Sequence, residues 1–175
     1  METDDEALAR AAGQGDRAAF ATLLNRRYDM LFRLCWRLTG AEDRAEDLAQ
    51  DVCAKLPRAL RSYRGDAKFT TWLYRIALNA ARDAGRKATT RKRAMEAYAA
   101  EPAAPPGEDA PLLDWLADAL TRLKPDLAET AALVVGEGLG QAEAADILGV
   151  TTGTVGWRMA EVKKALKAMA AEDGI

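Results

Sequence analysis

One helical face within residues 65–87, GDAKFTTWLYRIALNAARDAGRK, carries side chains suited to nucleic-acid chemistry. Counting along the helix in steps of three and four from the tryptophan places five residues on a single stripe: Trp72, Arg75, Asn79, Arg82 and Arg86. Guanidinium groups neutralise phosphates, and an aromatic ring can stack on a base. A core tryptophan beside a solvated arginine face is the alternative interpretation, and the spacing by itself leaves both open.

A second polar face lies in the preceding segment, residues 41–60. Asp43, Asp47, Gln50 and Asp51 share one side of the predicted helix, beside an apolar stripe that includes Leu48. Taken alone, an acidic face of this kind is most simply a solvent-exposed surface.

The segment 140–169, GQAEAADILGVTTGTVGWRMAEVKKALKAM, has the pattern of a helix-turn-helix. It predicts a short helix ending at Leu148, a turn at Gly149 and Val150, and a long helix capped near Thr151. The second helix of such a motif commonly enters the DNA major groove. Helical hairpins that bind nothing share the pattern. The predicted inward positions are Val155, Met159, Val162, Leu166 and Met169.

The elements that position these faces are all predicted to be helical. Apolar residues from Phe20 to Leu38 trace a long helix that ends at Gly40, and Pro125 separates two further helices over residues 112–123 and 126–135. Glycines 136, 138 and 140 most simply end a helix, because no strand precedes them and no phosphate-loop lysine follows.

The stretch MEAYAAEPAAPPGEDAP, residues 95–111, contains four prolines and predicts a linker. The expected fold is therefore all-α. Two small helical domains, residues 10–95 and 112–172, are joined by a Pro/Ala-rich linker over residues 96–111, and the second domain ends in the helix-turn-helix.

The amino-acid composition limits the kinds of function that the chain can have. Residues 1–100 carry 19 Lys+Arg and 14 Asp+Glu, whereas the remainder carries 6 and 13. Only the N-terminal part therefore has an excess of positive charge that suits binding to a polyanion. The chain has no histidine, and its two cysteines, Cys35 and Cys53, are expected to be buried reduced thiols. We expect no metal or other cofactor. No segment predicts membrane insertion or a signal peptide, which favours a cytoplasmic protein.

Three segments together resemble a known family, the extracytoplasmic-function sigma factors of bacterial RNA polymerase. They are AEDLAQDVCAKL, YRGDAKFTTWLYRIALNAARD and GQAEAADILGVTTGTVGWRMAEVKKAL, and they occur in the family's order around a variable linker. The resemblance runs from Gly15 to about Met169. It implies that residues 10–95 form sigma region 2 and residues 112–172 form region 4.

The resemblance assigns roles to the first two faces. It implies that Asp47, Gln50 and Asp51 contact core RNA polymerase, where carboxylates meet arginines. Pro57 stands where the family often has an aromatic residue. The loop and the Trp72 helix would open promoter DNA at its minus-ten element and hold a flipped base, whose extraction costs a few kcal/mol. The residues implied in minus-ten binding are Tyr63, Asp66, Lys68, Trp72, Arg75, Asn79, Arg82, Arg86 and Lys87.

Region 4 departs from the family pattern. The resemblance implies minus-thirty-five contacts from Thr152, Thr154, Trp157, Arg158, Lys163 and Lys164. However, Gly156 offers no side chain to a base edge and Glu161 would face phosphates.

The resemblance favours a non-catalytic sigma subunit held by an anti-sigma factor. A sigma-derived DNA-binding regulator or adaptor that does not itself initiate transcription is the alternative. A nuclease or phosphotransferase would need several acidic side chains that converge on one site, whereas the acidic residues of this chain are spread over helix faces.

Overall fold

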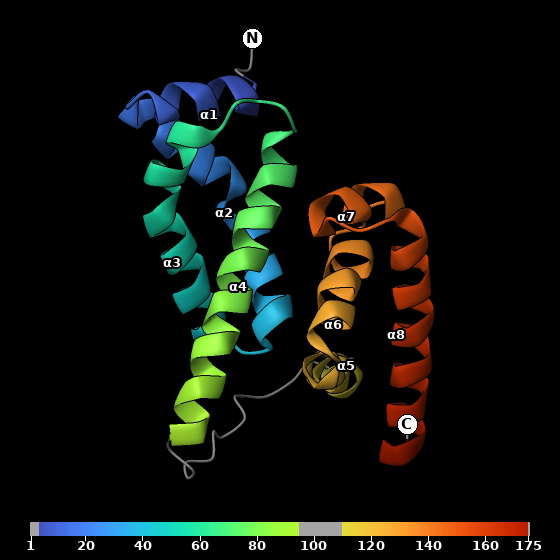
Figure 1. Cartoon of the computed structure of the whole chain (residues 1–175). Helices are drawn as coiled ribbons and strands as arrows, with labels where there is room; N and C mark the ends of the chain where they lie inside the picture. The colour runs from blue at the N-terminus through green and yellow to red at the C-terminus, as the bar shows by residue number, and fades with distance from the viewer. Residues whose placement is uncertain (1–3, 95–109, 175) are drawn as a thin grey trace.

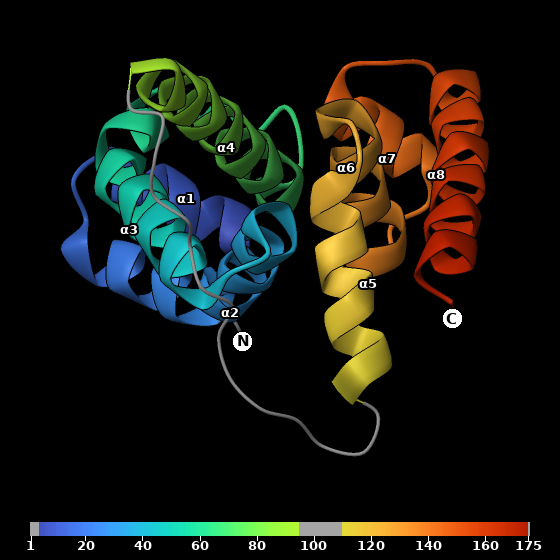
Figure 2. The same cartoon turned by 90° about the horizontal axis from the view of Figure 1, so that it is seen from below.

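The computed structural model describes residues 4–94 and 110–174. Every regular element in these ranges is helical, which confirms the all-α prediction. Four helices form the first group: α1 (Asp5–Gly13), α2 (Arg17–Thr39), α3 (Glu42–Ala59) and α4 (Phe69–Ala94). The second group comprises α5 (Ala110–Arg122), α6 (Pro125–Ala131), α7 (Gln141–Leu148) and α8 (Thr152–Asp173). The two groups lie side by side (Figures 1 and 2).

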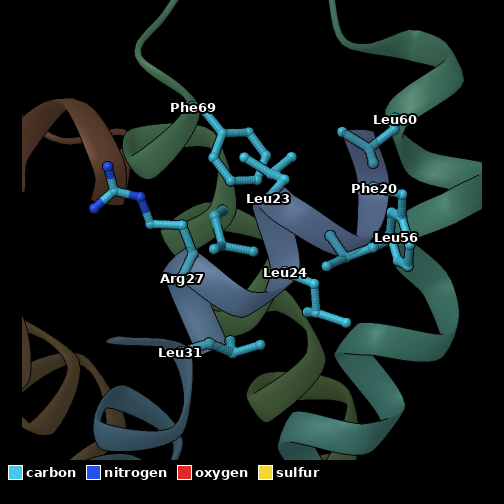
Figure 3. A pocket seen from close by; sticks show the side chains of 9 residues that line it. Phe20, Leu23, Leu24, Arg27, Leu31, Leu56, Leu60 and Phe69 are labelled. Atoms are coloured by element: carbon cyan, nitrogen blue, oxygen red, sulfur yellow. The ribbon is translucent and has the colours of Figure 1, made fainter. Parts of the chain in front are cut away.

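The first domain is a bundle of α2, α3 and α4 with α1 lying across one end (Figure 1). Its helices bury apolar residues that periodicity predicted, including Leu31, Cys35 and Leu48, and Leu34 is buried with them. A cavity of about 10 Å³ remains between α2, α3 and α4 (Figure 3). Such a space holds no more than about one water molecule. The interior between these three helices is therefore closely packed.

Helix α1 is an element that the sequence patterns did not reveal. It is nine residues long, begins after the N-cap Asp4 and buries Leu8, Ala9 and Ala12. Its end lies directly on the short 3₁₀ turn η1 (Leu60–Ser62), where a Cβ at Gly13 would come 2.4 Å from the Leu60 carbonyl oxygen. Only glycine permits this approach without a shift of the backbone.

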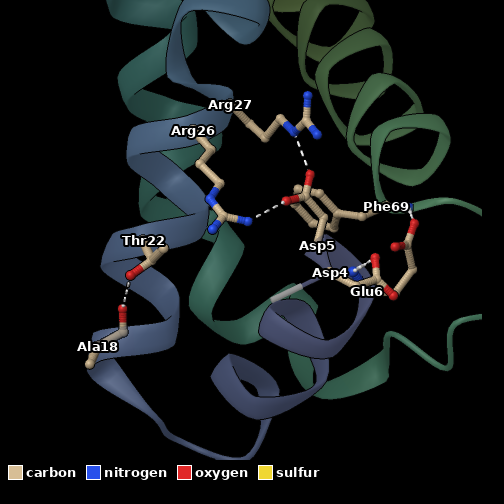
Figure 4. A network of polar contacts seen from close by, with 8 residues as sticks. All are labelled: Asp4, Asp5, Glu6, Ala18, Thr22, Arg26, Arg27 and Phe69. Carbon is tan, nitrogen blue, oxygen red and sulfur yellow. Dashed lines mark hydrogen bonds and ion pairs between the residues drawn. The ribbon is translucent and has the colours of Figure 1, made fainter. Parts of the chain in front are cut away.

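Acidic side chains at the start of α1 tie the bundle together (Figure 4). Asp5 is buried and forms ion pairs with Arg26 and Arg27 of α2. The Glu6 carboxylate accepts a hydrogen bond of 2.9 Å from the backbone N–H of Phe69, the first residue of α4. A carboxylate at a helix N-terminus satisfies an otherwise free donor and complements the helix dipole.

The ends of the helices largely follow the predicted signals. Pro57 lies inside the last turn of α3, which ends two residues later at Ala59 and is followed by η1. The helical turn η2 (Ala132–Gly136) ends at Gly136, and Gly138 takes a positive φ before α7, which confirms helix termination at this glycine cluster; Gly149 takes a positive φ in the predicted turn after α7. Thr151 caps α8 by accepting from the N–H of Thr154 at 3.1 Å.

The segment 126–135 differs from the single helix predicted. The α-helix ends at Ala131 and continues as a π-helical turn, η2 (Ala132–Gly136). The Glu137 N–H donates to the carbonyl of Ala132 at 2.9 Å, which closes the wider turn. This geometry carries Glu137 toward the first domain, where its side chain contacts Arg37 and Tyr74.

Candidate nucleic-acid interface

The acidic face of α3 points away from the core. Asp47, Gln50 and Asp51 are exposed, whereas Ala49 and Val52 on the opposite side are fully buried. Asp51 forms an ion pair with Lys55 one turn along the same helix. Such a pair between exposed side chains contributes little to stability. The face is therefore open to a charged partner without unfolding the helix.

An aromatic cluster holds the loop between η1 and α4. The Tyr63 ring contacts the ring of Phe69 edge-on at 6.0 Å and that of Trp72 at 5.3 Å between centroids. The Tyr63 hydroxyl donates to the Ala67 carbonyl at 2.8 Å, and burial is the largest cause that raises the pKa of this hydroxyl. Tyr63 is thus buried as a support for the loop, while Trp72 remains half-buried at its edge.

The loop itself presents polar groups to solvent. Asp66 and Lys68 are both exposed, and both follow the turn that Gly65 makes with a φ of 82°. Together with Trp72, they form a polar rim around an aromatic edge. This arrangement can offer hydrogen bonds and a stacking surface to an unpaired base.

Helix α4 lies beside the second domain (Figures 1 and 2), and two arginines of its polar stripe contact that domain. Arg75 donates to the Asp146 carboxylate at 2.9 Å and to the Asp146 carbonyl at 2.8 Å. Arg82 binds both carboxylate oxygens of Glu129, at 2.7 and 2.6 Å. The arginines of the stripe are therefore gathered on one face, but two of them are already engaged by carboxylates.

The other polar residues of the stripe are Asn79, between the two arginines, and Arg86 and Lys87, nearer the end of α4. The Asn79 side chain is exposed, and its oxygen accepts a long hydrogen bond of 3.4 Å from Arg82. Arg86 pairs with Asp83 on the same helix, and Lys87 is exposed. Arg86 and Lys87 thus extend the basic face toward the C-terminal end of α4.

Glu137 adds a third polar link between the domains. Its carboxylate accepts from the Tyr74 hydroxyl at 2.9 Å and pairs with Arg37 of α2. Burial first, and then the charge of Glu137, raise the pKa of Tyr74, so the hydroxyl stays protonated and remains a donor. The Glu137 side chain is only 5% exposed, which places this carboxylate inside the interface.

The helix-turn-helix is formed by α7 and α8, as predicted from its capping residues. Thr152, Trp157, Lys163 and Lys164 are exposed, Trp157 to 61%, and Thr154 is half-buried beside the cap. Arg158 differs from them, because its guanidinium lies 3.6 Å from Asp126 of α6 and its side chain is 16% exposed. The structure therefore brings most of the predicted region 4 residues to the surface but turns Arg158 inward.

Neither thiols nor carboxylates form a metal site in the described ranges, where no group of three or more candidate ligands occurs. Cys35 is buried, and this burial raises its pKa to about 12, whereas Cys53 is half-buried. No described helix is both long and apolar enough to cross a membrane.

Comparisons with known proteins match this arrangement to one family. Residues 23–91, which span most of α2 to α4, match the model of Sigma-70 region 2. The chain is 32% identical over 174 residues to the ECF RNA polymerase sigma factor SigM of Mycobacterium tuberculosis, an alignment that covers 94% of this chain and 84% of SigM. The chain belongs to the ECF sigma factors.

Other relatives of this sigma factor match it over part or all of its length. The ECF sigma factor SigW of Bacillus subtilis is 39% identical over 74 residues, which cover 42% of this chain and 40% of SigW. The structure of CnrH in complex with the cytosolic domain of CnrY has a TM-score of 0.70 and 26% identity, over 97% of this chain and 98% of CnrH. The sigma factor RpoE of Bartonella quintana, in complex with the anti-sigma factor NepR, also has a TM-score of 0.70, with 25% identity over 87% and 96% of the two chains.

The structure also shows site residues of this sigma factor that the sequence patterns did not suggest. Phe69 completes the aromatic cluster, and its spacing of three from Trp72 was an available signal. The carboxylates of Glu129, Glu137 and Asp146 had no such signal. Each meets a residue at least 47 positions away in the sequence, so only packing of the domains brings them together.

Proposed function

We propose that this sigma factor directs core RNA polymerase to specific promoters and opens the DNA at the minus-ten element. The observation that carries the proposal is the match to Sigma-70 region 2 over residues 23–91, because the acidic face of α3 and the Trp72 stripe of α4 both lie inside it. The domain of residues 10–95 performs this work, and the domain of residues 112–172 contributes contacts upstream.

Binding to polymerase uses the acidic face of α3. Asp47, Gln50 and Asp51 are exposed on one side of a helix whose opposite side is buried. A rigid row of carboxylates can form charge-assisted pairs with arginines of the polymerase, which supply both orientation and a fast association rate.

Strand separation uses the loop and the aromatic cluster. Asp66 and Lys68 offer polar contacts to an extruded base, Trp72 stacks at the edge of the cluster and Asn79 contacts a base edge. Tyr63 supports the loop from the interior of the domain, since its ring is buried and its hydroxyl is bonded to the loop. Arg75, Arg82, Arg86 and Lys87 follow the phosphates, which carry most of the affinity and its salt dependence.

Region 4 makes weaker contacts with the minus-thirty-five element. The DNA backbone is contacted by Thr152, Thr154, Lys163 and Lys164. Trp157 offers the largest exposed apolar surface of α8. Arg158 supports the domain from within through Asp126. The absence of a side chain at Gly156 and the charge of Glu161 limit base recognition here.

The protein works in the cytoplasm, carries no catalysis or cofactor of its own, and is held inactive by an anti-sigma factor until a signal releases it. The structural similarity to RpoE in complex with the anti-sigma factor NepR supports this control. Gly156, Glu161 and the inward Arg158 favour one alternative, in which a sigma-derived regulator binds DNA without initiating transcription.

Transcription with purified core polymerase tests the proposal. The full chain and core enzyme are incubated with a pool of genomic promoter fragments, and RNA starts are mapped by sequencing. We expect starts downstream of a shared minus-ten sequence that depend on the added chain. Binding of the chain to DNA fragments with no chain-dependent start would favour the regulator instead.

A further inference from the structure

The minus-ten loop, residues 64–68, rests on helix α1 at two points. The Glu6 carboxylate accepts a hydrogen bond of 2.9 Å from the backbone N–H of Phe69, the residue that follows the loop (Figure 4). A Cβ at Gly65 would lie 3.0 Å from Nη1 of Arg10, so this guanidinium lies against the turn of the loop. Glu6 and Arg10 are about one helical turn apart on the same face of α1. One face of α1 therefore contacts both the turn and the end of the minus-ten loop.

The bond to Glu6 replaces a cap that the start of α4 lacks in its own sequence. The Lys68 carbonyl accepts from the N–H of Trp72 at 3.1 Å, which makes Lys68 the N-cap residue. An N-cap side chain usually accepts a hydrogen bond from the first turn, but a lysine ammonium has no acceptor. Glu6, 63 positions before Phe69 in the chain, supplies an acceptor instead. Position 68 can thus carry an exposed cation without leaving the Phe69 N–H unpaired.

Helix α1 is itself anchored at both of its ends. Next to Glu6, Asp5 is buried and pairs with Arg26 and Arg27 of α2. At the other end of the helix, Gly13 lies against the backbone of η1, where a Cβ would come 2.4 Å from a carbonyl oxygen. Because these contacts hold both ends of α1, they fix the position from which Glu6 reaches the start of α4.

Phe69 connects the groups that the proposed function assigns to the extruded base. It directly follows Lys68 and lies three residues before Trp72, and its ring contacts the Trp72 ring at 5.8 Å between centroids. The Tyr63 ring, at the other end of the loop, contacts the Phe69 ring at 6.0 Å. A displacement of Phe69 therefore shifts both the minus-ten loop and the Trp72 ring.

We infer that Glu6 is a positioning residue for minus-ten recognition, which holds the first turn of α4 so that Asp66, Lys68 and Trp72 present one surface to an extruded base. Glu6 acts through the Phe69 amide and makes no contact with the base. The inference rests on the proposed function, since it takes the loop and Trp72 as the base-binding groups. Groups that are held in place before binding lose less conformational entropy on binding, and they keep the geometry that discriminates between bases.

Two conservative variants and a matched control separate the hydrogen bond from charge and from general stability. Glu6→Gln keeps the length of the side chain and an acceptor oxygen but removes the charge, whereas Glu6→Asp keeps the charge and withdraws the acceptor from Phe69 by the length of a methylene group. The control, Asp16→Ala, removes the cap of α2, which accepts from the N–H groups of Ala18 and Ala19 at 2.9 and 3.0 Å. Urea unfolding measures the stability of each full-length chain.

Amide hydrogen exchange, followed by NMR on the free chain, measures the protection of the Phe69 N–H. Fluorescence anisotropy measures binding of holoenzyme, assembled from the full chain and core polymerase, to labelled single-stranded oligonucleotides that carry the minus-ten sequence found by transcription mapping or one of its single-base variants. In Glu6→Asp we expect at least about tenfold faster exchange at Phe69 and at least about fivefold lower preference at one minus-ten position. Glu6→Gln should keep both values within about twofold of the unmodified chain, and Asp16→Ala should lose stability without losing preference.

Unchanged exchange at Phe69 in Glu6→Asp would overturn the inference, and so would an equal loss of affinity for every oligonucleotide, which indicates a purely structural role. A loss of preference in Asp16→Ala or Glu6→Gln as large as that in Glu6→Asp would also overturn it. Each of these results leaves the chain-dependent transcription starts of the unmodified chain intact. Failure of the proposed function removes those starts, and the inference falls with it, so the two failures are distinguishable.

Discussion

Arg82 of α4 and Glu129 of α6 form a bidentate ion pair, with Nε to Oε1 at 2.7 Å and Nη2 to Oε2 at 2.6 Å. Their hydrogen bond is the largest cause that raises the pKa of Arg82, and so reinforces its positive charge. One residue lies in the domain proposed to open promoter DNA and the other in the domain proposed to contact DNA upstream. The same guanidinium therefore connects domain arrangement with nucleic-acid binding.

Charge reversal on α3 should weaken binding to core polymerase. Asp47→Lys with Asp51→Lys replaces attractive contacts by repulsive ones on an exposed helix face. We expect at least about tenfold lower affinity, or about 1.4 kcal/mol, by anisotropy of labelled chain with purified core enzyme. The matched control reverses two other exposed acids, Asp29→Lys and Glu172→Lys. An equal loss of affinity in both double variants would indicate an effect of net charge and would contradict a specific docking face on α3.

Asn79 and Lys87 should differ in the kind of DNA contact they make. Both are exposed on α4, but a carboxamide can recognise a base edge whereas an ammonium binds a phosphate as a point charge. In holoenzyme, Asn79→Ala should relax preference at one minus-ten position. Lys87→Ala should weaken open complexes similarly on every promoter and reduce the salt slope by about 1. Permanganate footprinting across a set of single-base promoter variants measures both, and a uniform loss for Asn79→Ala would rule out a base contact.

Added positive charge on α8 should strengthen binding to minus-thirty-five DNA. A side chain at Gly156 can be accommodated, because its Cβ would lie 3.4 Å from Gln141 Oε1, and Glu161 is half-buried on the same helix. Gly156→Arg with Glu161→Arg adds two contacts, and one good base contact is worth about 1–3 kcal/mol.

For that pair we expect at least about tenfold tighter binding of duplex DNA by the full chain, with a steeper salt dependence, in anisotropy titrations at two salt concentrations. Ala168→Arg with Glu172→Arg makes the same charge change at exposed positions near the end of α8 and serves as the control. Tight, sequence-selective binding by the unmodified full chain that is lost in Trp157→Ala would show instead that Trp157 is the main residue that recognises this DNA.

Two glycines should respond oppositely to alanine. A Cβ at Gly13 would meet the Leu60 carbonyl oxygen at 2.4 Å, so Gly13→Ala must shift α1 from η1 and should destabilise by about 1–3 kcal/mol. A Cβ at Gly85, inside α4, would meet nothing within 4 Å, and Gly85→Ala should stabilise by about 0.5–1 kcal/mol. Urea unfolding followed by circular dichroism measures both. A neutral Gly13→Ala would mean that α1 does not lie on η1 in solution.

The sequence by itself determined the helices, their faces and the family. Helical periodicity and capping act within a few residues, so Leu48 beside Asp47 predicted a buried face next to a polar one, and Thr151 marked the start of α8. Both were confirmed. Helix α1 was missed because nine residues with a single leucine give a weak periodic signal, and its burial depends on contacts with η1 and α2.

Only the tertiary structure decided which charges meet. Arg82 and Glu129 are 47 residues apart, and Arg75 and Asp146 are 71 apart, so no local pattern relates them. From the sequence, arginine on a helix face suits solvent, phosphate or carboxylate equally well. The choice among these depends on packing of η2 and α7 against α2 and α4, which brings the acids within hydrogen-bonding distance of the arginines.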